Sequence, residues 1–136
     1  MDALSHLIEA YVSTNNNPAL DALILRGIRL ISENLRTAVA EPRNEAARMA
    51  MMEAAMLGGI AISSNWLGAC HSLAHQLSTF ADMHHGLACA LMLPPQMAFS
   101  SASAIERYTA VADALEPGAV DAEVAAELVY QLNVDI

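Results

Sequence analysis

The sequence predicts an all-helical, bundle-like domain without a sheet. Apolar residues recur at helical spacing in most segments, and no segment shows a sustained period-2 alternation of β-branched residues. The chain is 55% hydrophobic but only 4% aromatic, which suits a helical core built mainly from Ala, Leu and Met. Its 136 residues are close to the usual size of one domain. We therefore expect residues 1–136 to form a single helical domain.

The first part of the chain divides into three predicted helices. The first helix spans about residues 2–12. A second helix begins at Pro18, which suits a first helical turn, with Asn17 as its N-cap, and it ends near Ala40. A proline then breaks the chain, and a third helix follows over about residues 44–64.

The third predicted helix is apolar on all sides, so we expect it to be central and buried. Its most apolar run, residues 49–62, is too short for a membrane span by this reasoning. We interpret its four methionines as core packing and not as a soft-metal site. They are Met49, Met51, Met52 and Met56. Gly58 and Gly59 each cost about 1 kcal/mol relative to Ala in a helix, so we expect another helix or a ligand to approach closely there.

Four further helices are predicted in the second part of the chain. The fourth spans about residues 68–80, and the fifth opens at Gly86 with an apolar run through Leu93. The proline pair that follows should kink or end the fifth helix, because neither proline offers an N–H. The last two helices are expected at residues 105–115 and 121–132, separated by a Glu-Pro-Gly turn.

The charge balance excludes two classes of partner. The net charge is −9, from 15 acidic and 6 scattered basic residues, which argues against a nucleic-acid surface and against attraction to anionic membranes. Cys70 and Cys89 flank a group of histidines without a C-x-x-C pattern. With no signal-peptide pattern at the start, they indicate reduced thiols and a cytoplasmic protein. Cys70 is able to bind zinc beside His71, but we favour a small buried apolar side chain.

The histidines are the main candidates for chemistry, since residues 71–86 hold four of the five in the chain. His71 and His75 are four residues apart, as are Asp2 and His6, and residues at this spacing share a helix face with Cβ atoms roughly 5–6 Å apart. His85 precedes a glycine and is expected at a helix end, from which it can fold back toward His71. Two groups of metal-type ligands therefore predict one site, although Asp2 alone also suits a helix N-cap.

Several short motifs, in order and with matching spacing, carry a family resemblance over roughly residues 1–100. They are Asp2-Ala3-Leu4-Ser5-His6, Ile8-Glu9-Ala10-Tyr11, Ala47-Arg48-Met49, Gly58-Gly59-Ile60-Ala61, Leu67-Gly68, His71-Ser72-Leu73-Ala74-His75, His85-Gly86 and Leu93-Pro94. On these motifs the chain resembles the helical C-terminal domain of the iron-containing (group III) alcohol dehydrogenases.

The resemblance implies a ligand set for one divalent metal, Fe²⁺ or Zn²⁺. That set is Asp2, His6, His71 and His85. It also implies that His75 is not a ligand but lies near the substrate and the nicotinamide, in a catalytic and cofactor-binding position, which corrects the pairing of His71 with His75 that spacing alone suggests. The chain departs from the family at two positions, where Ser78 replaces a usual Gly and His84 a usual Pro. For His84 we favour an exposed loop residue.

The function implied by the resemblance is NAD(P)-dependent interconversion of an alcohol and an aldehyde or ketone, with the metal as a Lewis acid on the substrate oxygen. The dinucleotide-binding half of the family is absent and no G-x-G-x-x-G motif occurs, so we expect a fragment of a longer two-domain enzyme that is inactive alone. Apolar surface left uncovered makes a homo-oligomer an option.

Two alternatives remain open at this point. One is another member of the same superfamily, such as a glycerol dehydrogenase or a dehydroquinate synthase. The other is a non-catalytic helical interaction module whose histidines are incidental. The sequence leaves open the substrate, the choice of NAD or NADP, and the choice of iron or zinc.

Overall fold

A computed structural model describes all residues from 1 to 136, and it contains helices and no strand. The α-helices are α1 (Asp2–Val12), α2 (Asp21–Ala40), α3 (Glu45–Ser64), α4 (Ala69–Phe80), α5 (His85–Ser100), α6 (Ile105–Leu115) and α7 (Val124–Val134). Two short 3-10 helices, η1 (Pro18–Leu20) and η2 (Ser101–Ser103), complete the order. The predicted all-helical class is confirmed.

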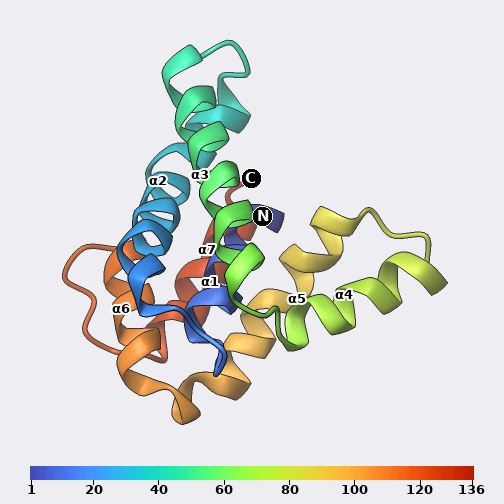
Figure 1. Ribbon diagram of the computed structural model, residues 1–136. Helices are drawn as coiled ribbons and strands as arrows, with labels where there is room; N and C mark the ends of the chain where they lie inside the picture. Colours follow the sequence, from blue (N-terminus) through green and yellow to red (C-terminus); the bar gives the residue numbers. More distant parts are fainter.

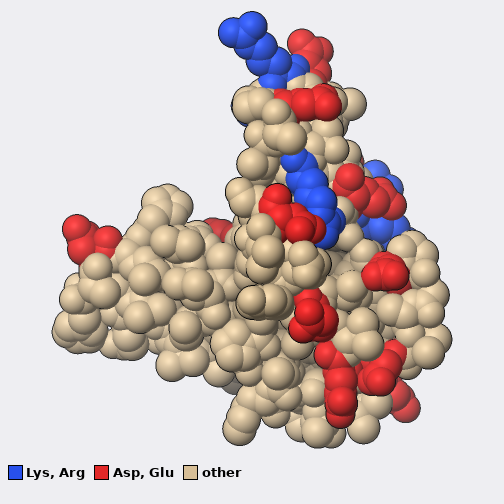
Figure 2. All heavy atoms as spheres, turned by 180° about the vertical axis from the view of Figure 1, so that it is seen from behind, with Lys and Arg blue, Asp and Glu red and all other residues tan.

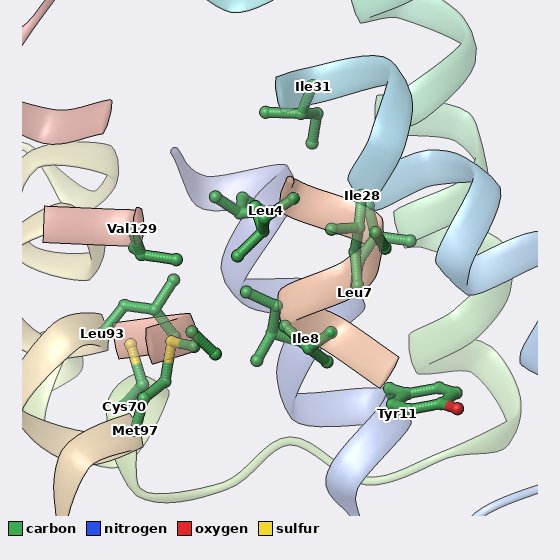
Figure 3. Packing of buried hydrophobic residues seen from close by; sticks show 14 of the residues in the cluster. Leu4, Leu7, Ile8, Tyr11, Ile28, Ile31, Cys70, Leu93, Met97 and Val129 are labelled. Carbon is green, nitrogen blue, oxygen red and sulfur yellow. The ribbon is translucent and has the colours of Figure 1, made fainter. Parts of the chain in front are cut away.

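Two helical pairs project from a common base (Figure 1). α2 packs along α3 in one pair, and α4 packs along α5 in the other. α1, α6 and α7 lie where the two pairs meet. The core sits at this base, where Leu4, Leu7 and Ile8 of α1 are fully buried beside Ile28 of α2 and Val129 of α7 (Figure 3). α1 is thus the central helix.

Local signals account for a few of the helix boundaries. The Asn17 side chain accepts a hydrogen bond from the Ala19 N–H at 3.1 Å, but the turn that it caps is the separate η1, and α2 begins afterwards. Asn44 caps α3 in the same way, accepting from the Ala47 N–H at 3.1 Å. The last helix begins three residues later than predicted, because Asp121 accepts from the Glu123 N–H at 3.0 Å in a turn that precedes it.

The expectation that α3 is central and buried is wrong, and of its four methionines only Met51 packs against the core. Met49, Met52 and Met56 are 62%, 64% and 58% exposed. The buried face of α3 is made mostly of small residues. It consists of Ala47, Ala54, Leu57, Gly58 and Ala61. Apolar composition does not reveal which face is buried, and here small side chains let α3 approach its neighbours while the long ones point outward.

The length of α3 also corrects the sequence analysis. At 20 residues it is long and apolar enough to cross a membrane by length and composition alone. That is weak evidence, because core helices of other proteins meet the same criterion.

The fifth helix was expected to kink or end at its prolines, and it does not end there, since α5 runs through Pro94 and Pro95 to Ser100. Pro94 has no N–H to donate to the carbonyl of Ala90. The Asn133 side chain of α7 donates to that carbonyl instead, at 2.7 Å. A neighbouring helix therefore supplies the hydrogen bond that the proline removes, and the helix continues.

Gly58 meets the expectation of a close approach, and Gly59 does not. A Cβ added at Gly58 would lie 3.3 Å from the Ala3 carbonyl oxygen and 3.4 Å from the His6 Cβ. A Cβ at Gly59 would meet nothing within 4 Å. Gly58 therefore brings α3 against α1 at one of the predicted metal ligands.

Candidate metal centre

Three helices bring the predicted ligands together, each near its N-terminal end. Asp2 and His6 lie on one face of α1, at positions one turn apart. His71 lies in the first turn of α4, and His85 is the first residue of α5. Because α4 and α5 form one pair whose base contacts α1, all four side chains reach the same place.

One carboxylate oxygen is the centre of this group. Oδ1 of Asp2 lies 3.5 Å from Nε2 of His6, 3.5 Å from Nε2 of His71 and 3.5 Å from Nε2 of His85. Ligand atoms bound at 2.0–2.2 Å around a tetrahedral ion are about 3.4 Å apart. The distances from Asp2 to the three imidazoles match this spacing, whereas the four donors that all lie within 4.8 Å of one another are those of Asp2, His71, His85 and Cys89, a set without His6.

The group is closed on one side and open on the other. The side chain of His71 is 3% exposed and that of His6 is 20% exposed, whereas His85 and Asp2 are 36% and 43% exposed. Burial lowers the pKa of His6, although the Asp2 carboxylate opposes the shift, which favours the neutral imidazole that binds metals. A small molecule can reach the cluster from the Asp2 and His85 side, as a catalytic metal requires.

Glu9 holds His71 in place, and the sequence analysis did not single it out. Glu9 is 2% exposed, and its Oε2 lies 2.6 Å from Nδ1 of His71. Its Oε1 accepts a hydrogen bond from the Cys70 N–H at 2.7 Å, so the carboxylate also caps the start of α4. A carboxylate that accepts from Nδ1–H leaves Nε2 free to face the cluster. The available signal was spacing, because Glu9 follows Asp2 by seven residues on the same face of α1.

The carboxylate of Glu9 also explains the glycine that precedes α4. A Cβ at Gly68 would lie 2.8 Å from Oε1 of Glu9, closer than side-chain atoms normally come. Gly68 thus leaves room for the carboxylate to reach the first N–H groups of α4.

Cys89 is the second residue that sequence reasoning missed. Its Sγ lies 3.6 Å from Nε2 of His85, 3.7 Å from Oδ1 of Asp2 and 3.9 Å from Nε2 of His71. The side chain is fully buried, and burial raises the pKa of the thiol, with the nearby Asp2 carboxylate adding to the shift. Cys89 is one helical turn after His85, a spacing that could have pointed to it.

The remaining histidines lie at the edge of the cluster. His75 is exposed, and its ring is 6.0 Å from that of His71 and stacks on that of His85 at 5.3 Å between centroids. His84 is exposed and precedes α5 as its N-cap residue, in agreement with the favoured interpretation. His75 is therefore adjacent to the four predicted ligands, whereas His84 points to the surface.

Comparison with known proteins identifies the family of the chain. The family model for the Fe-containing alcohol dehydrogenase family, C-terminal, matches residues 1–136. The 1,3-propanediol dehydrogenase of Citrobacter freundii is 42% identical over 113 residues, which are 83% of this chain and 29% of that protein. The NAD-dependent methanol dehydrogenase of Bacillus methanolicus is 37% identical over 115 residues, which are 85% of this chain and 30% of that protein.

Solved structures give the same result. An alcohol dehydrogenase from Oenococcus oeni superposes with a TM-score of 0.95 at 36% identity, covering 99% of this chain and 37% of that one. An iron-containing alcohol dehydrogenase from Thermococcus thioreducens superposes with a TM-score of 0.88 at 32% identity, covering 98% of this chain and 35% of that one. The chain thus spans about a third of the length of these relatives. It belongs to the Fe-containing alcohol dehydrogenase family, and it corresponds to the C-terminal part of that family.

Proposed function

We propose that this chain is the metal-binding catalytic domain of an NAD(P)-dependent alcohol dehydrogenase, which interconverts an alcohol and an aldehyde or ketone. The observation that carries the proposal is the equal 3.5 Å separation of three imidazole nitrogens from one oxygen of Asp2. The names of its relatives support the reaction class, since they include an NAD-dependent methanol dehydrogenase and an NADPH-dependent butanol dehydrogenase.

The residues that would hold the metal are Asp2, His6, His71 and His85. Three imidazoles and one carboxylate suit either Fe²⁺ or Zn²⁺. The bound ion would supply a Lewis acid for the substrate oxygen. Within the chain, Glu9 keeps the His71 ring in the orientation that directs Nε2 inward, and the exposed side near His85 admits the substrate.

We assign His75 a role in positioning the substrate or relaying a proton. It is exposed and stacks on the ring of His85, so it borders the open side of the cluster without contacting Asp2. An imidazole can accept and donate a proton near neutral pH, as proton transfer to or from a substrate hydroxyl requires. In the full-length enzyme, His75→Ala should lower turnover and leave the metal content unchanged. Equal loss of turnover and metal would contradict the assignment.

Dehydrogenase turnover also needs a dinucleotide-binding part, and residues 1–136 contain no glycine-rich phosphate-binding motif. We propose that residues 1–136 act as one domain of a two-domain cytoplasmic enzyme and show no turnover by themselves. Its partners would be a small alcohol or aldehyde and NAD(P). The outward-facing methionines of α3 would support self-association in a homo-oligomer.

Elemental analysis of the purified chain tests the metal site directly. Wild-type protein reconstituted with Fe²⁺ or Zn²⁺ should hold close to one ion per chain, and the double variant His71→Ala/His85→Ala should hold none. His84→Ala is the matched control, because this neighbouring histidine is exposed and should leave the metal content unchanged. Equal metal in the wild type and the double variant would mean that the histidines are incidental and would reject the proposed site.

A further inference from the structure

Two different side chains can complete one set of three donors at the metal centre. The donor atoms of Asp2, His71, His85 and Cys89 all lie within 4.8 Å of one another. His6 is the other candidate fourth donor, at 3.5 Å from Asp2. The carboxylate and the two imidazoles can therefore be completed by either of two donors. One is the nitrogen of His6 from α1, and the other is the sulfur of Cys89 from α5.

The distances from Cys89 fit coordination as well as packing. A thiolate bound at about 2.3 Å and a nitrogen or oxygen bound at about 2.1 Å lie about 3.6 Å apart around a tetrahedral ion. The corresponding distances from Sγ of Cys89 to its three neighbours are 3.6, 3.7 and 3.9 Å. Weak hydrogen bonds to sulfur also fall in this range, and what points to coordination is that all three neighbours of Sγ are metal-type donors within 4.8 Å of one another.

His71 gives independent evidence that the cluster is built to receive a ligand. Its side chain is only 3% exposed, and Glu9 occupies its Nδ1 at 2.6 Å. Its Nε2 points into the cluster, where Asp2 lies at 3.5 Å and Cys89 at 3.9 Å. Both neighbours of this buried nitrogen are metal-type donors, so an ion placed among the three atoms would contact a nitrogen, an oxygen and a sulfur.

The second cysteine lies outside the Asp2 group, in a separate set of buried polar side chains with Glu9 and His71. Cys70 is fully buried, and its Sγ faces the carbonyl oxygen of Cys89 at 3.7 Å rather than the Asp2 carboxylate. It lies close to Met97 and Leu93 of the core (Figure 3). Cys70 therefore serves as a matched control for Cys89.

We propose that Cys89 is a metal ligand of this centre and can replace His6 as the fourth donor. The inference rests on the metal site proposed above. With His6 the ion would have one oxygen and three nitrogen donors, and with Cys89 it would have one oxygen, two nitrogen and one sulfur donor. A thiolate favours zinc-type ions, so Cys89 would extend the range of metals that the chain holds tightly.

Cobalt substitution tests coordination by Cys89 without any measurement of activity. The 136-residue chain is loaded with Co²⁺, the metal content is measured, and the near-ultraviolet absorbance is scanned for a sulfur-to-cobalt charge-transfer band. Wild type and Cys70→Ser should bind one ion and show the band. Cys89→Ser should bind the ion and lack the band, with its helical circular dichroism unchanged.

Zinc titration then tests whether Cys89 can replace His6. His6→Ala should still bind one Zn²⁺ per chain, and His6→Ala/Cys89→Ser should lose stoichiometric binding. Cys89→Ser alone should weaken zinc binding by about 10- to 100-fold, the range typical of residues that support a metal site. Complete loss of zinc in His6→Ala would overturn the exchange of donors.

The outcomes separate this inference from the proposed function. One bound Co²⁺ without the band in wild type, or a band that persists in Cys89→Ser, would overturn the role of Cys89 and leave the four-ligand site standing. Absence of bound Co²⁺, Zn²⁺ and Fe²⁺ in the wild-type chain would overturn both.

Discussion

The two projecting helical pairs have similar shapes and opposite surface chemistry. The α2–α3 pair and its connection carry five of the six basic residues of the chain. They are Arg26, Arg29, Arg36, Arg43 and Arg48. Residues 69–100, which form the α4–α5 pair, contain one charged residue, Asp82, together with four histidines. Figure 2 shows the contrast, because the blue side chains gather on the upper projection and the other projection is almost entirely tan.

Both pairs contain an apolar helix, but α3 and α5 bury different kinds of side chain. On α3 the small residues face inward, and exposed ion pairs such as Arg26 to Glu53 at 2.7 Å lie among outward methionines. On α5 the large residues Leu93 and Met97 are fully buried, and the polar groups of the pair concentrate at its base around His71 and His85. The α2–α3 pair is solvated along its length, whereas the α4–α5 pair keeps its polar chemistry at one point.

The largest expected effect comes from removing the Glu9 carboxylate, which contacts the base of the α4–α5 pair at His71. Glu9→Ala should lower the free energy of unfolding by about 3 kcal/mol, because it leaves the buried His71 ring and the first N–H groups of α4 without their partner. It should also weaken zinc binding. Urea denaturation of the metal-free protein and zinc titration measure the two effects.

Glu53→Ala on α3 is the control for this substitution, since it removes a carboxylate from an exposed ion pair. It should not move the urea midpoint measurably, because surface ion pairs contribute little. A similar loss of stability in both variants would abolish the distinction between the two pairs.

A second comparison uses the adjacent glycines of α3. Gly59→Ala should raise the free energy of unfolding by about 0.5–1 kcal/mol, because Ala is the better helix former and nothing lies within 4 Å of the new Cβ. Gly58→Ala should give no such gain and should weaken zinc binding, since its Cβ would press on Ala3 and His6. Equal stabilisation by the two substitutions, with unchanged zinc affinity, would show that α3 does not constrain the metal centre.

The hydrogen bond between α7 and α5 should be worth about 1 kcal/mol. Asn133→Ala removes the donor to the Ala90 carbonyl, so it should destabilise the chain by about that amount. Pro94→Ala restores an N–H to α5 and should recover part of the loss in the double variant. A thermodynamic cycle of the four proteins measures the coupling, and strictly additive effects would contradict it.

The smallest expected effect is on the stability of the fold at alkaline pH. It involves Tyr108 of α6, a helix that lies where the two helical pairs meet. Burial raises the pKa of Tyr108 above the ordinary value of 10.0, although hydrogen bonds from Gln96 and Ser100 oppose the shift. The unfolded chain therefore loses this proton first, and stability should fall as the pH rises above 10. Tyr108→Phe should remove this part of the decline in urea midpoint. Tyr130→Phe should not, because Tyr130 is 54% exposed.

Local signals explain how much of the fold the sequence predicted. α1 and α6 have the predicted bounds, and α3 begins at Glu45, one residue after the predicted start, because Asn44 caps it. Which side chains are buried could not be predicted from such local signals. The outward methionines of α3 and the continuation of α5 past Pro94 depend on neighbouring helices, so the order of residues within one helix does not reveal them.

The residues of the candidate site were likewise predicted only in part from the sequence. Family motifs point to Asp2, His6, His71 and His85, and the fold brings these side chains together around one oxygen. Glu9 and Cys89 were missed because their significance lies in what they face across the fold, 62 residues away for Glu9 and His71. The clues in the sequence were spacing within a helix, the motif that contains Glu9, and the position of Cys89 beside the histidines.

The span of the ligands along the chain has a consequence for folding. They run from residue 2 to residue 85, so no ion can bind all of them until the chain has closed a loop of most of its length. A bound ion would then stabilise the closed chain by the free energy of its binding, because the unfolded chain does not hold the four ligands together. Metal loading would thus be one of the last events in folding, and after its loss the packing of α1 against α5 would remain as the link between the two ends of this loop.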